Sequence, residues 1–196
     1  SMDLPTNLFY QIVTRYQSTI AHMFFAHSHE DTFSVFYHNT NGNSSSASLR
    51  TQDAVGIALH SPSVTPLTNM NPGIRILQVN PETYEIMNYD QFYTPLQNVQ
   101  NQTETAKGLV WYHLYSAREA YGNFSAAKAA GSYHAPVQLN DDGTWPAFVP
   151  LNASFWASIS DEVLARPELA TQFQIFQGRN SPLSPPCSNK ACAKAK

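Results

Sequence analysis

The chain has 196 residues, of which 42% are hydrophobic and 13% are charged, and its net charge is -3. This length is sufficient for one ordinary domain with a sizeable core. The low, slightly negative charge excludes the basic surface typical of nucleic-acid-binding proteins. We see no apolar run of about 18 residues that would predict a membrane-spanning helix, and no signal peptide at the start.

The first hundred residues predict a helix followed by strands. Residues 5–17 place apolar side chains at four-residue spacing after a proline, as at the start of a helix. Short apolar or β-branched runs then indicate strands at residues 20–26, 32–37, 54–59, 74–79 and 83–89, the last two forming a hairpin. Residues 60–73 contain three prolines. We expect them to form a long loop, either a wall of a substrate site or an ordinary surface loop.

The second half of the chain has a helical character. One apolar stripe that predicts a helix ends at Gly122 and consists of Val110, Leu114, Ala117 and Tyr121. Two more helices are expected around Trp156, Ile159 and Val163, and around Leu169, Phe173 and Phe176. The order of helix, sheet and then helices predicts a mixed α/β chain of the α+β class.

The stretch FFAHSHEDTF places His27 and His29 two positions apart at the end of a predicted strand. In extended backbone such residues share a face, so two imidazole nitrogens could bind metal together. The pattern is weak by itself, because this composition gives roughly 0.25 such pairs by chance, and solvated loop histidines are the alternative. Catalytic zinc also needs a third ligand. We expect Glu30 and Asp31 to orient a histidine or cap the turn rather than bind metal.

The other five histidines show no comparable clustering and are expected to be structural or surface residues; they are His22, His38, His60, His113 and His134. Motifs of serine hydrolases, P-loop proteins, dinucleotide-binding proteins and H-E-x-x-H metalloproteases are absent from the sequence. Among common catalytic patterns, the histidine pair therefore stands alone as a candidate.

Two features bear on the cellular compartment. Acceptor patterns for N-glycosylation occur at Asn43, Asn101, Asn123 and Asn152. Asn101 could instead cap a helix, and the sequence leaves this choice open. Cys187 and Cys192 lie close together in a polar tail, where a disulfide is favoured over a metal-binding pair if the compartment is oxidising.

The segment YQIVTRYQSTIAHMFFAHSHEDTFSVFY (10–37) resembles the acid sphingomyelinases and acid sphingomyelinase-like phosphodiesterases of the calcineurin-like metallophosphoesterase superfamily. In that family the motif is G-H-T-H, followed by an acidic residue and an F-x-V-F-Y strand. The resemblance continues through residues 61–79, 81–89 and 111–122 and resumes in the Cys-bearing tail. Together these segments are specific, whereas the histidine pair alone is not.

The resemblance implies a secreted or lysosomal (vacuolar) phosphodiesterase with two zinc ions, in which His27 binds one ion and His29 the other. Asp31 is the candidate for supporting these ligands. Residues 1–100 would be the C-terminal part of the catalytic β-sandwich flanked by helices, and residues 101–196 a helical subdomain with the Cys-bearing tail. The implied substrate is a phospholipid such as sphingomyelin, or another phosphodiester, and the resemblance allows peripheral membrane contact. The low charge of the chain separately predicts no nucleic-acid partner.

Two departures from the family pattern limit this expectation. Ala26 replaces the motif's glycine, which would strain the turn if that position required a positive φ. The family's other metal ligands precede this region, and none of their motifs occurs in this sequence. We therefore expect a C-terminal portion of an enzyme that is inactive alone and pairs with the missing N-terminal part. The alternative is a non-catalytic secreted fragment or pseudo-enzyme that acts as an interaction module.

Overall fold

The computed structural model describes residues 5–38, 49–99, 108–184 and 186. Its helices are α1 (Pro5–Arg15), α3 (Ala117–Tyr121), α4 (Ser125–Ala130), α5 (Ala153–Ala165) and α6 (Pro167–Gln177), with short 3-10 helices η2 (Thr51–Asp53), η3 (Leu67–Asn69) and η4 (Leu96–Asn98). Its strands are β1 (Met23–Phe25), β2 (Thr32–Tyr37), β3 (Ala54–His60), β4 (Gly73–Val79), β5 (Ile86–Tyr93) and β6 (Tyr112–Ser116). This mixture confirms the predicted α+β class.

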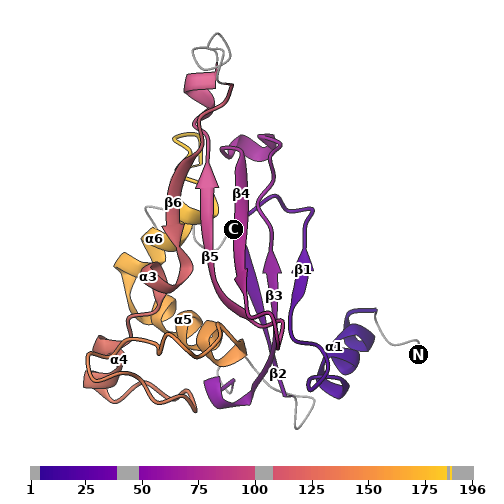
Figure 1. The fold of residues 1–196 in the computed structure, drawn as a ribbon, viewed down its shortest axis with the longest axis vertical. Coiled ribbons are helices and arrows are strands. Elements are labelled where there is room, and N and C mark those ends of the chain that lie inside the picture. The colour runs from indigo at the N-terminus through magenta and orange to yellow at the C-terminus, as the bar shows by residue number, and fades with distance from the viewer. Residues whose placement is uncertain (1–4, 39–48, 100–107, 185, 187–196) are drawn as a thin grey trace.

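The first sheet has the strand order β1-β3-β2, with β1 parallel and β2 antiparallel to the central strand β3. Successive side chains of β3 point to opposite faces, and both faces are covered. Ala58 packs with Val13 of α1 on one face, while Ile57 and Leu59 join the large core that includes α5. The sheet therefore lies between helices from the two ends of the described chain (Figure 1).

The second sheet has the order β4-β5-β6 and is antiparallel throughout. It confirms the predicted hairpin but corrects the helix expected from the stripe Val110 to Tyr121. Residues 112–116 pair with β5 as strand β6, and only residues 117–121 are helical. Pairing with an available strand edge overrides the local period, because a tertiary partner outweighs weak intrinsic propensity.

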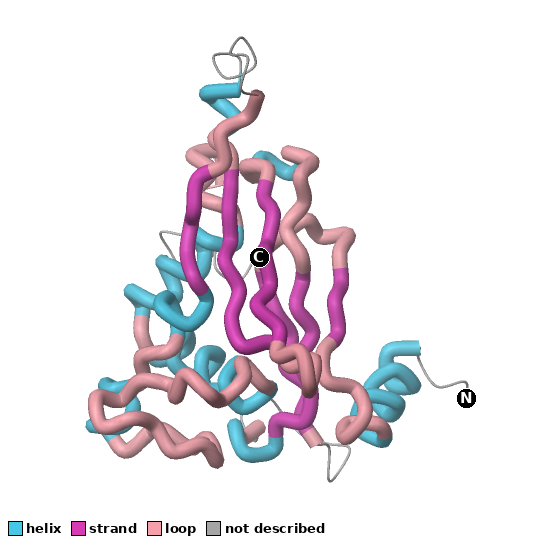
Figure 2. Tube along the Cα trace, in the orientation of Figure 1, coloured by secondary structure: helices cyan, strands magenta, loops and turns pink. Residues whose placement is uncertain are grey.

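The helices α3 to α6 gather on one side of the strands, while α1 lies on the other (Figure 2). Helix α5 begins at Asn152, whose side-chain oxygen accepts a hydrogen bond from the Phe155 N–H at 3.1 Å and so caps the helix. Trp156 and Ile159 of α5 are fully buried. Helix α6 begins at Pro167, and both α5 and α6 confirm the predicted helices.

The face of α1 that carries the predicted apolar spacing is largely exposed. Leu8 is 47% and Ile12 50% exposed, and Val13 is the buried residue of this helix. Strand β1 beside it forms an edge of the first sheet, and its Phe24 is 53% exposed. An apolar helix face and an apolar strand edge thus lie next to each other at the surface.

The proposed division of the chain near residue 100 stays a prediction, because residues 100–107 lie outside the described part. Strand β6 from the second segment completes the sheet of the first segment. Among the described residues, no helix combines the length and the apolar character needed to cross a bilayer.

Candidate metal centre

His27 and His29 lie on the turn that follows β1, which we call the histidine turn (residues 26–30). Both have left-handed backbone, with φ of 85° at His27 and 61° at His29. Such a conformation costs a non-glycine residue on the order of 1–2 kcal/mol, so the surrounding structure must hold it. Ala26 is not among the residues with positive φ. The left-handed backbone conformation therefore occurs at the two histidines and not at residue 26, where the family motif has glycine.

The two imidazoles differ in their surroundings. His27 is exposed, whereas His29 is half-buried and its Nδ1 atom is buried without a hydrogen-bond partner. A buried polar atom without a partner is costly, on the order of 1–3 kcal/mol. An imidazole nitrogen held in this state is available to a metal ion or to a donor from outside the described chain.

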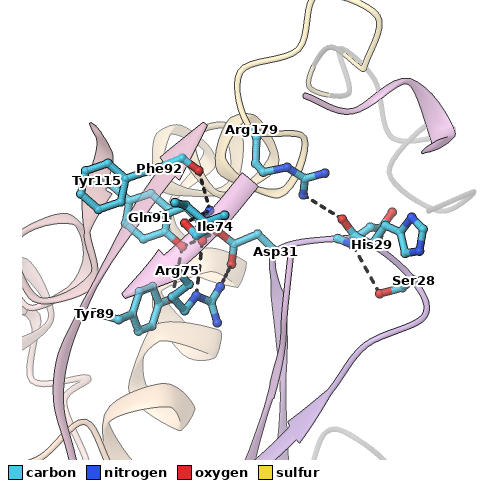
Figure 3. Close-up of polar contacts among 11 residues, drawn as sticks. Ser28, His29, Asp31, Ile74, Arg75, Tyr89, Gln91, Phe92, Tyr115 and Arg179 are labelled. Atoms are coloured by element: carbon cyan, nitrogen blue, oxygen red, sulfur yellow. Dashed lines mark hydrogen bonds and ion pairs between the residues drawn. The ribbon is translucent and has the colours of Figure 1, made fainter. Parts of the chain in front are cut away.

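The histidine turn is held from the end of α6. Arg179 is fully buried, and its Nη1 donates to the His29 carbonyl at 2.7 Å (Figure 3). Its Nε donates to the Asn71 carbonyl. Burial lowers the pKa of Arg179 to about 10. Asn71 in turn donates its side-chain N–H to the Arg179 carbonyl at 2.9 Å. One guanidinium thus joins the histidine turn to the loop before β4.

A glycine makes this clasp sterically feasible. A Cβ atom added to Gly73 would overlap the Cδ and Nε atoms of Arg179, so only glycine leaves room for the arginine stem. The sequence reasoning did not identify Arg179. The signal that was present is the NPG turn at residues 71–73, which marks a close backbone approach without naming the approaching residue.

Asp31, the candidate for orienting a histidine, contacts other partners. Its carboxylate forms an ion pair with Arg75 of β4 and accepts a hydrogen bond from the Tyr115 hydroxyl of β6 at 2.7 Å. The Arg75 guanidinium also lies 4.1 Å from the centre of the Tyr89 ring, a cation–π distance. Asp31 therefore links β2 to the second sheet, next to the histidine turn (Figure 3).

Both members of the Asp31–Arg75 ion pair are buried. Burial alone would lower the pKa of Arg75, but the adjacent Asp31 carboxylate raises it above its usual range. Desolvation raises the pKa of Tyr115 and of Tyr89, so both hydroxyls stay protonated at neutral pH. The neighbouring Glu30 accepts a hydrogen bond from the Gln177 amide at 2.8 Å. Both carboxylates of the predicted site thus have protein partners.

The described residues supply only part of a metal site. Within residues 5–38, 49–99, 108–184 and 186, no group of three or more His, Cys, Asp and Glu side chains is placed to hold a metal ion. The unpartnered Nδ1 of His29 fits a metal ligand. A zinc ion at this turn would need further ligands from elsewhere.

Three of the remaining histidines have structural contacts. His22 Nε2 accepts the Ile86 N–H at 3.0 Å, His60 Nε2 lies 3.0 Å from the Ser34 hydroxyl, and His113 Nε2 lies 2.9 Å from Asp90. His38 and His134 are exposed.

The predicted glycosylation and disulfide residues are partly visible. Asn123 is exposed, and Asn152 is half-buried as the cap of α5. Asn43, Asn101, Cys187 and Cys192 lie outside the described residues. These modifications stay predictions.

Comparison with known proteins adds a sequence relationship. No family model matches the chain. It is 36% identical over 115 residues to sphingomyelin phosphodiesterase 1 of Caenorhabditis elegans, covering 58% of this chain and 18% of that protein. It is 30% identical over 118 residues to sphingomyelin phosphodiesterase of Bos taurus, covering 58% of this chain and 17% of that protein. A cyclic GMP-AMP phosphodiesterase of Rattus norvegicus is 29% identical over 117 residues, covering 57% of this chain and 23% of that protein.

The chain therefore spans less than a quarter of the length of each of these relatives. Several sphingomyelin phosphodiesterases match over more than half of the chain, and the histidine turn has the residue pattern of the resemblance noted in the sequence. The chain is thus similar in sequence to sphingomyelin phosphodiesterases over about 58% of its length.

Proposed function

We propose that the chain carries part of the metal centre of a metal-dependent phosphodiesterase of the sphingomyelinase type. The observation that carries this proposal is the state of His29: its Nδ1 is buried and unpartnered, on a turn held in left-handed backbone by a buried arginine. Strained backbone that is held by its surroundings is typical of functional sites. The names of the relatives support the reaction class.

In this proposal His27 and His29 would each bind one of two zinc ions. Two such ions, when bound, lower the pKa of a shared water and neutralise charge on the phosphoryl oxygens. Hydrolysis would form a bond from the water oxygen to phosphorus and break the bond from phosphorus to the ceramide oxygen, with one proton of the water ending on the ceramide oxygen. The products from sphingomyelin are phosphocholine and ceramide.

The contribution of the chain's own residues is to hold the backbone of the histidine turn. Arg179 holds the carbonyl of His29, and Asp31 anchors the following strand to Arg75. Both contacts restrict the backbone near His29, so less backbone freedom would be lost when a metal binds there. Arg75 and Tyr115 occupy the Asp31 carboxylate. Asp31 would therefore position the turn by anchoring the adjacent strand and not by contacting a histidine ring.

The remaining ligands would come from the part of the parent protein that precedes this region. The exposed face of α1 and the β1 edge provide an apolar surface for that part, with Phe24, Leu8 and Ile12 on it. An uncovered strand edge offers free backbone groups for pairing. We therefore propose that the isolated chain binds zinc weakly and does not hydrolyse sphingomyelin.

The proposal is tested by zinc titration calorimetry and by an activity assay. In the isolated chain, His29→Ala should remove the weak zinc binding, whereas His134→Ala, an exposed histidine elsewhere, should leave it unchanged. In the full-length parent, His27→Ala and His29→Ala should each abolish hydrolysis of sphingomyelin. Retained activity in either variant would overturn the metal-ligand assignment. Tight stoichiometric zinc with turnover in the isolated chain would show that the ligand set is complete.

A second function rests on the same exposed surface. If the parent gene lacks the family's D-x-H and N-H motifs upstream, the apolar face of α1 and the β1 edge favour a non-catalytic interaction module. The substrate also has two candidates, because one relative is a cyclic GMP-AMP phosphodiesterase. Parallel assays of the parent with sphingomyelin and with cyclic GMP-AMP would separate them.

The setting that fits this function is secreted or lysosomal. In that setting we propose glycans at the acceptor asparagines and a disulfide between Cys187 and Cys192. Glycosidase treatment followed by mass spectrometry, with and without reduction, would measure both modifications. A mass that does not increase by two hydrogens on reduction would exclude the disulfide.

A further inference from the structure

The loop between β3 and β4 presents an exposed apolar tip. Val64 is 62% and Leu67 58% exposed. The Gly73 N–H donates to the Ser63 carbonyl at 2.9 Å and closes the loop at its base, while Met70 is buried beside that base. Closed loops of this kind are compact and frequently functional. The two aliphatic side chains are therefore displayed by a loop whose foot is packed into the protein.

The same loop is attached to the histidine turn. The Ser61 N–H donates to the carbonyl of Phe25, the residue that ends β1, at 2.8 Å. Arg179 contacts both the Asn71 carbonyl in the loop and the His29 carbonyl in the turn. Figure 1 shows η3, at the tip of this loop, and the end of β1 at the same end of the strands. The apolar tip therefore has a fixed position beside the candidate metal centre.

A third exposed aliphatic residue belongs to this region. Leu183 is 65% exposed and lies on a turn whose Ser181 hydroxyl donates to the Asn69 carbonyl at 2.6 Å. Residues 61–74 contain no Asp, Glu, Lys, Arg or His. Moving a charged side chain into a lipid layer is costly, and this loop carries none. Shape and composition thus favour an apolar surface that meets a lipid layer.

We propose that Val64, Leu67 and Leu183 form a lipid-contact surface that enters the headgroup region of a choline-phospholipid bilayer. The contact would place the phosphodiester of a lipid near the histidine turn. This inference rests on the proposed function, because a lipid substrate explains why an apolar surface stands beside a metal centre. Apolar side chains that project from a firmly held element bind membranes through the area that they bury.

The test is sedimentation of the full 196-residue chain with vesicles of sphingomyelin and phosphatidylcholine. We expect Leu67→Asp and Val64→Asp each to lower the partition into vesicles about tenfold, as the loss of most of one buried aliphatic side chain predicts. Leu164→Asp is the matched control, since Leu164 is 87% exposed at the end of α5, and it should change partition by less than about twofold.

Further variants separate lipid contact from other causes. Leu67→Trp keeps an apolar side chain and should bind vesicles at least as well as the unchanged chain, with a blue shift of its fluorescence. This variant decides the question if circular dichroism shows that the Asp variants do not fold. Ile12→Asp tests the exposed face of α1. Binding that is lost in Ile12→Asp but kept in Leu67→Asp would overturn the proposal, as would an unchanged chain that does not sediment.

The vesicle assay needs neither zinc nor turnover, so its failure is distinct from failure of the proposed function. In the full-length parent, Leu67→Asp should lower hydrolysis of vesicle-bound sphingomyelin and leave hydrolysis of a soluble chromogenic phosphodiester unchanged. An equal loss with both substrates would show that Leu67 acts on the metal centre and would exclude the lipid-contact role.

Discussion

The side chain of Arg179 occupies the space that a Cβ atom at position 73 would need, and this space is free for it because residue 73 is glycine. The arginine reaches through this space to the carbonyls of Asn71 and His29. The absence of a side chain at Gly73 thus allows Arg179 to hold the backbone of the histidine turn.

Gly73→Ala should destabilise the chain, because the new methyl group forces the Arg179 stem away. We expect the free energy of unfolding in urea to fall by about 1–3 kcal/mol, as in other overpacked sites. Gly131→Ala is the control: Gly131 has a φ of 68° but open space around it, so it carries only backbone strain of about 1 kcal/mol. Equal losses would mean that Arg179 moves aside without cost.

Arg179→Lys should weaken zinc binding by the chain as well as its stability. A lysine cannot reproduce the planar fork that reaches two carbonyls, so about 1.5–3 kcal/mol of stability should be lost. Arg118→Lys is a matched control, because Arg118 also donates to backbone carbonyls, those of Pro146, Met87 and Val149. It should cost similar stability without changing zinc affinity by calorimetry. Unchanged zinc affinity in Arg179→Lys would show that Arg179 does not support zinc binding.

Asp31→Asn should be severe, because it leaves Arg75 buried without an opposite charge. Breaking a buried pair from one side typically costs about 3–5 kcal/mol, measurable by chemical unfolding. Asp53→Asn breaks the exposed pair with Arg50 and should cost less than about 1 kcal/mol. The double variant Asp31→Asn with Arg75→Met should recover much of the loss. No recovery would show that Asp31 stabilises the fold through Tyr115 rather than through Arg75.

Stability should fall with acidification in part through His22. Burial lowers the pKa of His22, and its neutral Nε2 accepts the Ile86 N–H. A histidine whose folded pKa is lowered stabilises the fold above the unfolded pKa of about 6.5, and this contribution is lost as the pH falls toward the folded value.

Unfolding at pH 7.5 and pH 5 should therefore show a smaller decline in His22→Gln than in the unchanged chain. His60, whose pKa burial also lowers, contributes equally to both proteins and cancels in the comparison. Parallel pH profiles in the two proteins would contradict the role assigned to His22.

Local sequence patterns were sufficient where each element depends on its own residues. Strand β2, the β4–β5 hairpin and helices α5 and α6 follow from β-branched runs, a short turn and a proline before an apolar stripe. Strand β6 could not be predicted this way, because Tyr112–Ser116 becomes a strand only when β5 offers it an edge.

The candidate site shows the same limit. The histidine pair was visible because its two members are close in the sequence. Its supports were not visible, because Arg179 contacts His29 across 150 residues and Asp31 contacts Tyr115 across 84. A lone arginine or aspartate carries no pattern that reveals a distant partner. The positive φ angles of His27 and His29 also had no local signal in the sequence.

The distance along the chain between His29 and Arg179 has a consequence for biosynthesis. The histidine turn leaves the ribosome 150 residues before the arginine that fixes it. At translation rates of about 5–20 residues per second, Arg179 is made roughly 8–30 s after the histidine turn. A nascent chain therefore cannot fix the backbone of the histidine turn through this contact until Arg179 itself has been made.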